Sequence, residues 1–216
     1  MAKSIGLVGG TGPEGKGLAA RFAQAGLEVR IGSRSAERGR EAATEVRGLA
    51  GGIVEGGANE DVVRGADVVV LTVPYAGLRD TLTGLAGAIG GAIVVSAVVP
   101  LQFSRARIAA LDVPEGSAAQ QAQALLPQAK VAGAFQNLSA GHLLDVSHPL
   151  EGDVVVCADD AEARQETMAL AGLLPGIRAV NGGPLANSRY VEEITALLLN
   201  INRIYKAETH IKVLGL

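Results

Sequence analysis

The sequence has few residues of several types, and each shortage excludes a class of protein. The chain of 216 residues has one cysteine, Cys157, no tryptophan, three phenylalanines and three tyrosines. A single cysteine cannot form an internal disulfide or a Cys-x-x-Cys metal or redox site. The histidines at 142, 148 and 210 form no H-E-x-x-H or similar cluster, so we expect surface or packing roles for them. The sequence therefore predicts no bound metal and favours a reducing, cytoplasmic location.

Long apolar runs and a strong net charge are also missing. The longest apolar stretches, Ala66 to Val73 and Ala92 to Leu101, are shorter than the roughly 20 residues that span a bilayer, so no membrane association is expected. A net charge of −3 disfavours nucleic acid as a partner. A composition that is 48% hydrophobic and 19% charged excludes a disordered chain. Small molecules are the expected partners.

The first half of the chain alternates short β-branched runs with alanine-rich segments that carry charge. This alternation is typical of a parallel sheet covered by helices on both faces, the doubly wound α/β arrangement. The predicted strands are Ser4–Val8, Glu28–Ile31, Asp67–Val73 and Ala92–Val98. The predicted helices are Gly15–Ala25, Ser35–Val46, Gly77–Leu85 and Ser104–Leu111.

A break in this alternation between residues 112 and 116 divides the chain into two predicted parts. We expect residues 1–115 to form a Rossmann-type nucleotide-binding domain and residues 116–216 a smaller C-terminal α/β part. Ser117 and Gln120 have capping-box spacing, which predicts a helix over Ser117–Leu126. Strands are predicted at Lys130–Phe135, Asp153–Ala158 and Arg178–Val180, with Asp159 capping the helix between the last two.

A long helix is predicted to close the chain, starting near Asn187. Its apolar residues keep helical spacing, and Leu199 widens the stripe beyond one face. We interpret this width as a surface that packs on a second subunit of a homodimer.

A glycine-rich segment, Gly10-Thr11-Gly12-Pro13-Glu14-Gly15, matches the pattern G-x-G-x-x-G. In such loops Gly10 would permit the tight turn, Gly12 would let the backbone approach a pyrophosphate, and Gly15 would let the helix pack close to the strand. The hexapeptide alone is compatible with an ordinary glycine turn. Its position after the first predicted strand and before an alanine-rich helix favours dinucleotide binding.

The end of the second predicted strand indicates which dinucleotide is bound. NAD sites carry Asp or Glu there, whereas NADP sites replace the acid with arginine and small donors. This chain has Ser33 and Arg34 at the strand end, followed by Arg38. The two arginines can converge on a phosphate, although a solvated helix start would also carry such charges. We therefore favour NADP(H).

Several segments together resemble the NADPH:coenzyme F-420 oxidoreductases, also called F-420-dependent NADP reductases. The resemblance spans the chain and rests on Gly9 to Leu18, Ile31 to Arg34, Leu71 to Tyr75, Val99 to Leu101 and Gly183 to Arg189. It implies a homodimer with a Rossmann domain that transfers hydride reversibly between NADP and the deazaflavin coenzyme F-420. Such a reaction needs two rings held face to face, without a nucleophile or metal.

The resemblance also implies which residues hold the two cofactors. Ligands of open α/β sheets bind beyond the carboxyl ends of the strands. We expect Pro74 and Leu138 to position the rings, and we expect no residue to act as a catalytic acid or base. The residues expected to bind the cofactors are therefore Thr72, Val73, Pro74, Tyr75, Val98, Val99, Pro100, Gln136, Asn137, Leu138, Asn187 and Ser188. Family members commonly have a histidine where this chain has Gln136, which cannot titrate.

Two other functions remain open from the sequence. One is an NADPH-dependent reductase of a different small, flavin-like acceptor, because a fold does not fix a reaction. The other is a protein that binds NADP without catalysis and signals to a partner.

Overall fold

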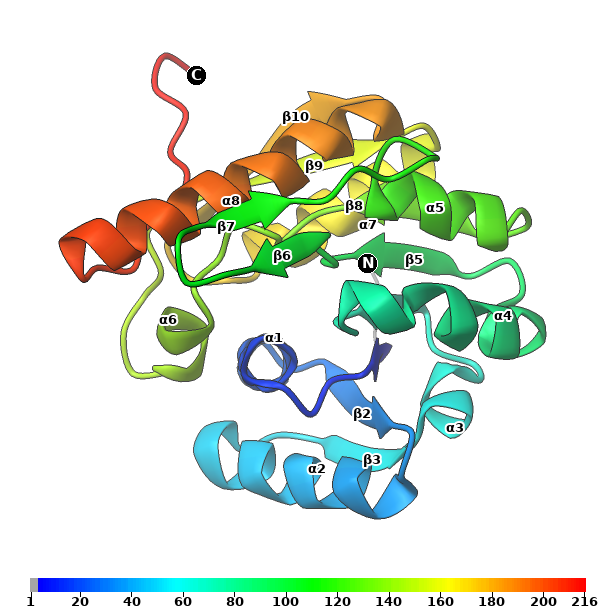
Figure 1. Cartoon of the computed structure of the whole chain (residues 1–216). Helices are drawn as coiled ribbons and strands as arrows, with labels where there is room; N and C mark the ends of the chain where they lie inside the picture. The colour runs from blue at the N-terminus through cyan, green and yellow to red at the C-terminus, as the bar shows by residue number, and fades with distance from the viewer. Residues whose placement is uncertain (1–3) are drawn as a thin grey trace.

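The computed structural model describes residues 4–216, so the first three residues of the expected N-terminal domain lie outside the described part. Its centre is an eight-stranded sheet with the order β10-β9-β8-β5-β4-β1-β2-β3 (Figure 1). Neighbouring strands are parallel except for β8 and β9. The strands of this sheet are β1 (Ser4–Val8), β2 (Glu28–Ser33), β3 (Val54–Ala58), β4 (Val68–Leu71), β5 (Ile93–Ser96), β8 (Lys130–Gly133), β9 (Gly152–Ala158) and β10 (Ile177–Gly183).

Helices cover both faces of the sheet, and each face has its own apolar core. The core on one face includes residues of α1, α2, α6 and α7, and the core on the other includes residues of α3, α4 and α5. The long helix α8 packs beside α5 and the small hairpin of β6 (Leu101–Phe103) and β7 (Ile108–Ala110) (Figure 1). The helices are α1 (Pro13–Gln24), α2 (Ala36–Ala50), α3 (Asn59–Val63), α4 (Leu78–Ile89), α5 (Ala118–Leu125), α6 (Ala140–Leu144), α7 (Ala161–Gly172) and α8 (Ser188–Tyr205).

The predicted doubly wound fold is confirmed, because the apolar runs are central parallel strands. Every residue of β1, β4 and β5 is buried, as strands with helices on both faces require. Ser117 caps α5 as predicted, since its Oγ accepts a hydrogen bond of 3.0 Å from the Gln120 N–H. No helix among residues 4–216 is long and apolar enough to cross a membrane.

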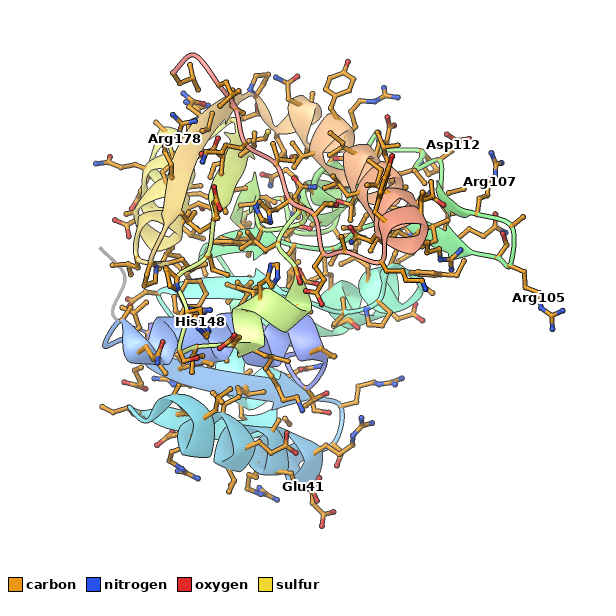
Figure 2. All side chains as sticks on the ribbon, turned by 90° about the vertical axis from the view of Figure 1, so that its left-hand side faces the viewer. Glu41, Arg105, Arg107, Asp112, His148 and Arg178 are labelled. Carbon is orange, nitrogen blue, oxygen red and sulfur yellow. The ribbon has the colours of Figure 1, made fainter. Side chains whose placement is uncertain are left out.

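The helix predicted over Ser104–Leu111 is wrong. This region instead forms an antiparallel hairpin of β6 (Leu101–Phe103) and β7 (Ile108–Ala110). Ser104 closes the turn, since its Oγ donates to the Arg107 carbonyl at 2.6 Å, and the turn's Arg105 and Arg107 point into solvent (Figure 2). Asn200 of α8 bonds to both backbone groups of Ile108 at 3.0 and 2.7 Å. These distant contacts favour the hairpin over the local helical propensity.

Two smaller predictions also need correction. Asp160, not Asp159, caps α7, because its carboxylate accepts from the Ala163 N–H at 2.9 Å. Asp159 instead accepts from the Leu185 N–H at 3.0 Å. The glycine-containing strand β3 and the short helices α3 and α6 were not predicted, because segments of five residues carry little periodicity.

Two of the contacts that join the C-terminal part to the N-terminal part lie in the sheet and at α1. Strand β8 extends the sheet by pairing with β5, and Arg21 of α1 reaches the region of α6, which lies beside α1 in Figure 1. The buried Arg21 guanidinium donates to four carbonyl oxygens, at 3.0, 2.9, 2.7 and 2.6 Å, those of Leu143, His148, His142 and Asp145. These hydrogen bonds fix the α6 region against the last turn of α1.

Candidate functional site

The glycine loop joins β1 to α1 at the point where the strand order changes direction. Gly10 donates its N–H to the Gly32 carbonyl at 3.0 Å, and Gly12 is the N-cap of α1. A Cβ at Gly15 would lie 2.6 Å from the Gly10 Cα, so the helix and the turn are in backbone contact. A Cβ at Gly12 would meet no atom of residues 4–216 within 4 Å. Open space at the positive end of a helix is suited to an anion.

The turn before this loop is held by a residue that the sequence did not indicate. Gly9 has φ +73°, in the region that favours glycine, and a Cβ there would lie 2.5 Å from Cγ1 of Val73. Its N–H donates to Oδ1 of Asn59 at 3.1 Å. Asn59 opens α3 directly after β3, so this contact became visible only with that strand.

A cleft of about 400 Å³ lies beyond the ends of β1 and β2 and contains both predicted arginines, so we call it the arginine cleft. Arg34 and Arg38 are exposed, and no other described residue binds either guanidinium. Ser33 lies beside them at the end of β2. Unpaired guanidinium groups beside a serine hydroxyl form a suitable site for a phosphate. The cleft is lined by Gly9, Thr11, Gly12, Ser33, Arg34, Arg38, Asn59, Thr72, Val73, Pro74, Gly77 and Thr81.

A larger cleft of about 640 Å³, here called the central cleft, adjoins the arginine cleft. The two share Gly12, Thr72, Val73 and Pro74 in their linings, so they are contiguous. The predicted site residues that line the central cleft are Gly12, Pro13, Glu14, Gly15, Thr72, Val73, Pro74, Tyr75, Val98, Val99, Gln136, Asn137 and Leu138.

One wall of the central cleft is the loop between β8 and α6. Phe135 has φ +74°, which an aromatic residue rarely adopts, and its ring packs against Phe22 of α1. The turn brings Gln136 to the cleft, where its Nε2 donates to the Ser96 carbonyl at 3.2 Å. The buried Gln136 Oε1 has no hydrogen-bond partner among residues 4–216. A free acceptor in a cleft wall is suited to a ligand N–H or O–H group.

Helix α8 holds this loop in place. The side-chain amide of Asn137 donates to the Val191 carbonyl at 2.9 Å and to the Thr195 hydroxyl at 2.8 Å. The Thr195 hydroxyl lies 3.2 Å from the Gln136 carbonyl oxygen and can donate to it. Asn137 therefore positions Gln136 as well as lining the cleft.

Four predicted site residues do not line either cleft. Gly10 lies beneath the loop against Leu7. Pro100 is buried away from both clefts, and its carbonyl accepts a hydrogen bond of 2.9 Å from the Leu111 N–H. Asn187 donates to the Gly182 carbonyl at 2.7 Å, and Ser188 is fully buried against Gly133. Their positions favour supporting roles at the glycine turn and at the start of α8.

Several residues that line the central cleft were missed by the sequence reasoning. They come from the start of α6, the inner side of α8 and the segment after α8, namely Ser139, Ala140, Gly141, Thr195, Leu198, Leu199, Asn202, Ala207, Glu208 and Thr209. No motif marks them, because the chain after α8 meets α6 only in the folded structure. Glu208 accepts a hydrogen bond from Ser139 Oγ in that contact.

Two carboxyl groups have raised pKa values. Burial raises the pKa of Glu192 to about 7, although the carboxylate accepts backbone N–H bonds from Ala118 at 2.7 Å and Ala119 at 3.1 Å. This group ties α8 to the start of α5 and lies outside both clefts. Burial raises the pKa of Glu14, in the central cleft, to about 8.

Residues 4–216 contain no cluster of His, Cys, Asp or Glu that could hold a metal ion.

The fold and these clefts define a class of protein. A parallel sheet that changes direction beside β1, a glycine loop at a helix start and a cleft at that point are the features of Rossmann-type dinucleotide-binding proteins.

Comparisons with known proteins identify the family within this class. Residues 4–100 match the family described as NADP oxidoreductase coenzyme F420-dependent. The F420-dependent NADP reductase of Methanothermobacter thermautotrophicus is 42% identical over 94% of this chain and 90% of its own length. That of Methanocaldococcus jannaschii is 38% identical over 98% of both chains. The chain therefore belongs to the F420-dependent NADP reductase family, as its sequence motifs predicted.

Solved structures support the fold. A putative F420-dependent NADP reductase from Arthrobacter has a TM-score of 0.83, with 24% identity and full coverage of both chains. A 3-hydroxyisobutyrate dehydrogenase from Mycobacterium tuberculosis has a TM-score of 0.68 with 16% identity, over 95% of this chain and 62% of its own.

The roles of Gly12 and Gly15 in the glycine loop can be separated by substitution. Gly12→Ala adds a methyl group in open space, so we expect a change in stability below about 0.5 kcal/mol. The same methyl group obstructs an anion at the helix start, so NADPH binding should weaken roughly tenfold, or about 1.4 kcal/mol. Gly15→Ala drives a Cβ against Gly10 and should cost about 2 kcal/mol or more. Urea unfolding and fluorescence titration with NADPH measure both effects; equal stability losses would contradict this division.

Proposed function

We propose that this protein transfers a hydride reversibly between NADPH and the deazaflavin coenzyme F-420. The observation that carries the proposal is the pair of adjoining clefts, one with unpaired arginines and one walled by aliphatic and proline residues. Family membership supports the same reaction, and it favours neither another flavin-like acceptor nor a non-catalytic sensor.

The arginine cleft and the glycine loop fit NADP(H). The open backbone at Gly12 and the start of α1 would bind the pyrophosphate, while Ser33, Arg34 and Arg38 would bind the 2′-phosphate. The nucleotide would pass from one cleft into the other along Thr72, Val73 and Pro74, which line both.

The central cleft fits two stacked rings. Bound coenzyme F-420 supplies a ring carbon that accepts the hydride from the nicotinamide. The chain contributes an apolar wall from Val73, Pro74, Val98 and Leu138, which keeps water out and sets the approach of the rings. The free Oε1 of Gln136 would accept a hydrogen bond from a ring N–H, and Asn137 and Thr195 hold that amide in place.

We also propose that the two parts of the chain divide this work. Residues 1–115 would bind NADP(H), and residues 116–216 would complete the deazaflavin side of the cleft and form a homodimer. A cytoplasmic location follows from the use of NADPH, which is an intracellular reductant.

An absorbance assay tests the reaction. Protein mixed with NADPH and oxidised F-420 should remove the visible band of the deazaflavin, and FMN in its place should react far more slowly. Nucleotide binding without turnover of either acceptor would support a sensor. Turnover of FMN without F-420 would support a reductase of a different acceptor.

The arginine cleft should determine the preference between the two nicotinamide cofactors. Replacing Arg34 and Arg38 together by alanine removes both charges, so the KM for NADPH should rise on the order of 100-fold, or about 3 kcal/mol. The KM for NADH should change little, because NADH has no 2′-phosphate. Arg40→Ala, an exposed arginine of α2 outside both clefts, is the matched control. Equal effects on NADPH and NADH would contradict the assignment.

The homodimer is supported by exposed apolar side chains on α8 and β6. Leu197, Ile204, Tyr205 and Phe103 are 57%, 72%, 74% and 66% exposed. An apolar surface of this kind is typical of a subunit interface.

Sedimentation of the protein at micromolar concentration should show a dimer. Leu197→Glu combined with Ile204→Glu should give a folded monomer, because two buried charges would oppose association. Leu49→Glu, on the distant helix α2, places the same charge at another exposed leucine and should leave the dimer intact. A wild-type monomer would contradict the proposal.

A further inference from the structure

Glu14 is an ionisable residue in the wall of the central cleft. It is the second residue of α1, inside the glycine loop, and lies among Tyr75, Gln136 and Leu138 in the lining of the cleft. The side chain is partly buried and makes no hydrogen bond or ion pair with any other described residue. An acid in this position has no partner among the described residues and only partial access to bulk water.

The charged groups around Glu14 do not compensate its charge. On α1 itself, Lys16 pairs with Glu45 of α2 at 2.6 Å, and Arg21 is bound by carbonyl oxygens of the α6 region. The other titratable groups in the lining of the central cleft are the phenol of Tyr75 and the carboxyl of Glu208.

More distant charges are directed elsewhere. His142 of α6 lies 3.8 Å from the Glu208 carboxylate, and Arg34 and Arg38 line the neighbouring cleft. Among residues 4–216, therefore, no cation lies beside a carboxylate at position 14, and burial raises its pKa to about 8. At neutral pH the group is mainly a neutral acid.

The proposed reaction requires such a group because it consumes a proton. NADPH, a proton and oxidised F-420 give NADP⁺ and reduced F-420. The C4–H bond of the nicotinamide breaks and a new C–H bond forms on the deazaflavin, so two electrons and one hydrogen pass as a hydride. The second hydrogen, which the reduced deazaflavin carries on nitrogen, must come from the protein or from water. Gln136 cannot supply it, since an amide does not titrate.

We infer, on the basis of the proposed function, that Glu14 holds this proton: it is a neutral acid beside NADPH and a carboxylate beside the cationic nicotinamide of NADP⁺. The physical cause is charge balance in a desolvated space. A lone carboxylate in the cleft is costly, and a positive ring in the same cleft offsets that cost. Hydride transfer creates the positive ring, so it also makes Glu14 a stronger acid at the moment when the proton is needed. The reverse reaction returns the proton to Glu14.

Nucleotide binding alone tests the inference without F-420. NADP⁺ should bind the ionised form of Glu14, so its binding to the wild-type protein at neutral pH should release up to about one proton. NADPH should release none from this group. Both nucleotides carry the same 2′-phosphate, so the difference between them isolates the nicotinamide end. Calorimetry in buffers of different ionisation enthalpy measures the proton number directly.

The pH dependence has a defined sign. Below the pKa that Glu14 has in the nucleotide-free protein, the Kd for NADP⁺ should fall relative to the Kd for NADPH, by about tenfold for each unit rise in pH. This trend should level off above about pH 8. Glu14→Gln removes the titrating group and keeps the size of the side chain. It should abolish both the proton release and the relative pH trend while NADPH still binds.

Glu208→Gln is the matched control, because Glu208 is the other carboxyl group in the cleft lining. This variant should keep the extra proton release with NADP⁺. Thermal unfolding of each variant checks that the fold is intact. In the absorbance assay, Glu14→Gln should slow F-420 reduction by about 10²-fold or more and flatten its pH profile.

The possible outcomes separate this inference from the proposed function. Equal proton release with the two nucleotides in the wild-type protein, or an unchanged difference in Glu14→Gln, would overturn the role of Glu14. Loss of the difference in Glu208→Gln alone would assign the proton to Glu208 and also overturn it. Proton release of the expected kind in a protein that never reduces F-420 would support the titration of Glu14 and overturn the proposed function alone.

Discussion

The backbone contact between Gly10 and Gly15 is the constraint on which the site depends. A Cβ on Gly15 would lie 2.6 Å from the Gly10 Cα, so only glycine lets α1 start directly above the end of β1. That start places free N–H groups and open space at Gly12 where the strand order changes direction. The same short distance brings Glu14, one position before the contact, into the central cleft. A single packing requirement therefore sets both an anion site and the position of an acid.

The C-terminal part completes a cleft that the glycine loop only begins. Arg21 fixes α6 against α1 through four carbonyl oxygens, and Asn137 joins the β8–α6 loop to α8. A buried guanidinium with several acceptors is costly to leave unpaired, so the two parts are strongly coupled through this contact. The strained φ of +74° at Phe135 is tolerated because Phe22 and the surrounding loop enclose the ring. The polar positions of Gln136 and Asn137 thus depend on packing from both parts of the chain.

Much of the fold and part of the candidate site could be predicted from the sequence, for a physical reason. Central parallel strands bury both faces, so runs such as Val68 to Leu71 have a local signature, and the glycine loop is a local backbone requirement. The hairpin β6–β7 and the roles of Asn59 and Glu208 depend on partners that lie far away in the sequence. Asn200 stabilises the hairpin from α8, and no periodicity in residues 101–110 reports that contact. Contacts between distant parts of the chain therefore determine the hairpin and the positions of Asn59 and Glu208, and local sequence patterns do not predict them.

A hydride-transfer site has two requirements that conflict, and the central cleft shows how one chain can meet both. Water must be excluded so that the rings meet in a fixed geometry, and yet the overall reaction takes up a proton that bulk water would ordinarily supply. An apolar wall alone satisfies the first requirement, and a solvated acid alone satisfies the second. An unpaired, partly buried carboxyl group in the wall, that of Glu14, satisfies both, because it stays neutral until the nicotinamide becomes cationic. Gln136 can then serve as a fixed hydrogen-bond acceptor, because proton storage no longer depends on the side chain at that position.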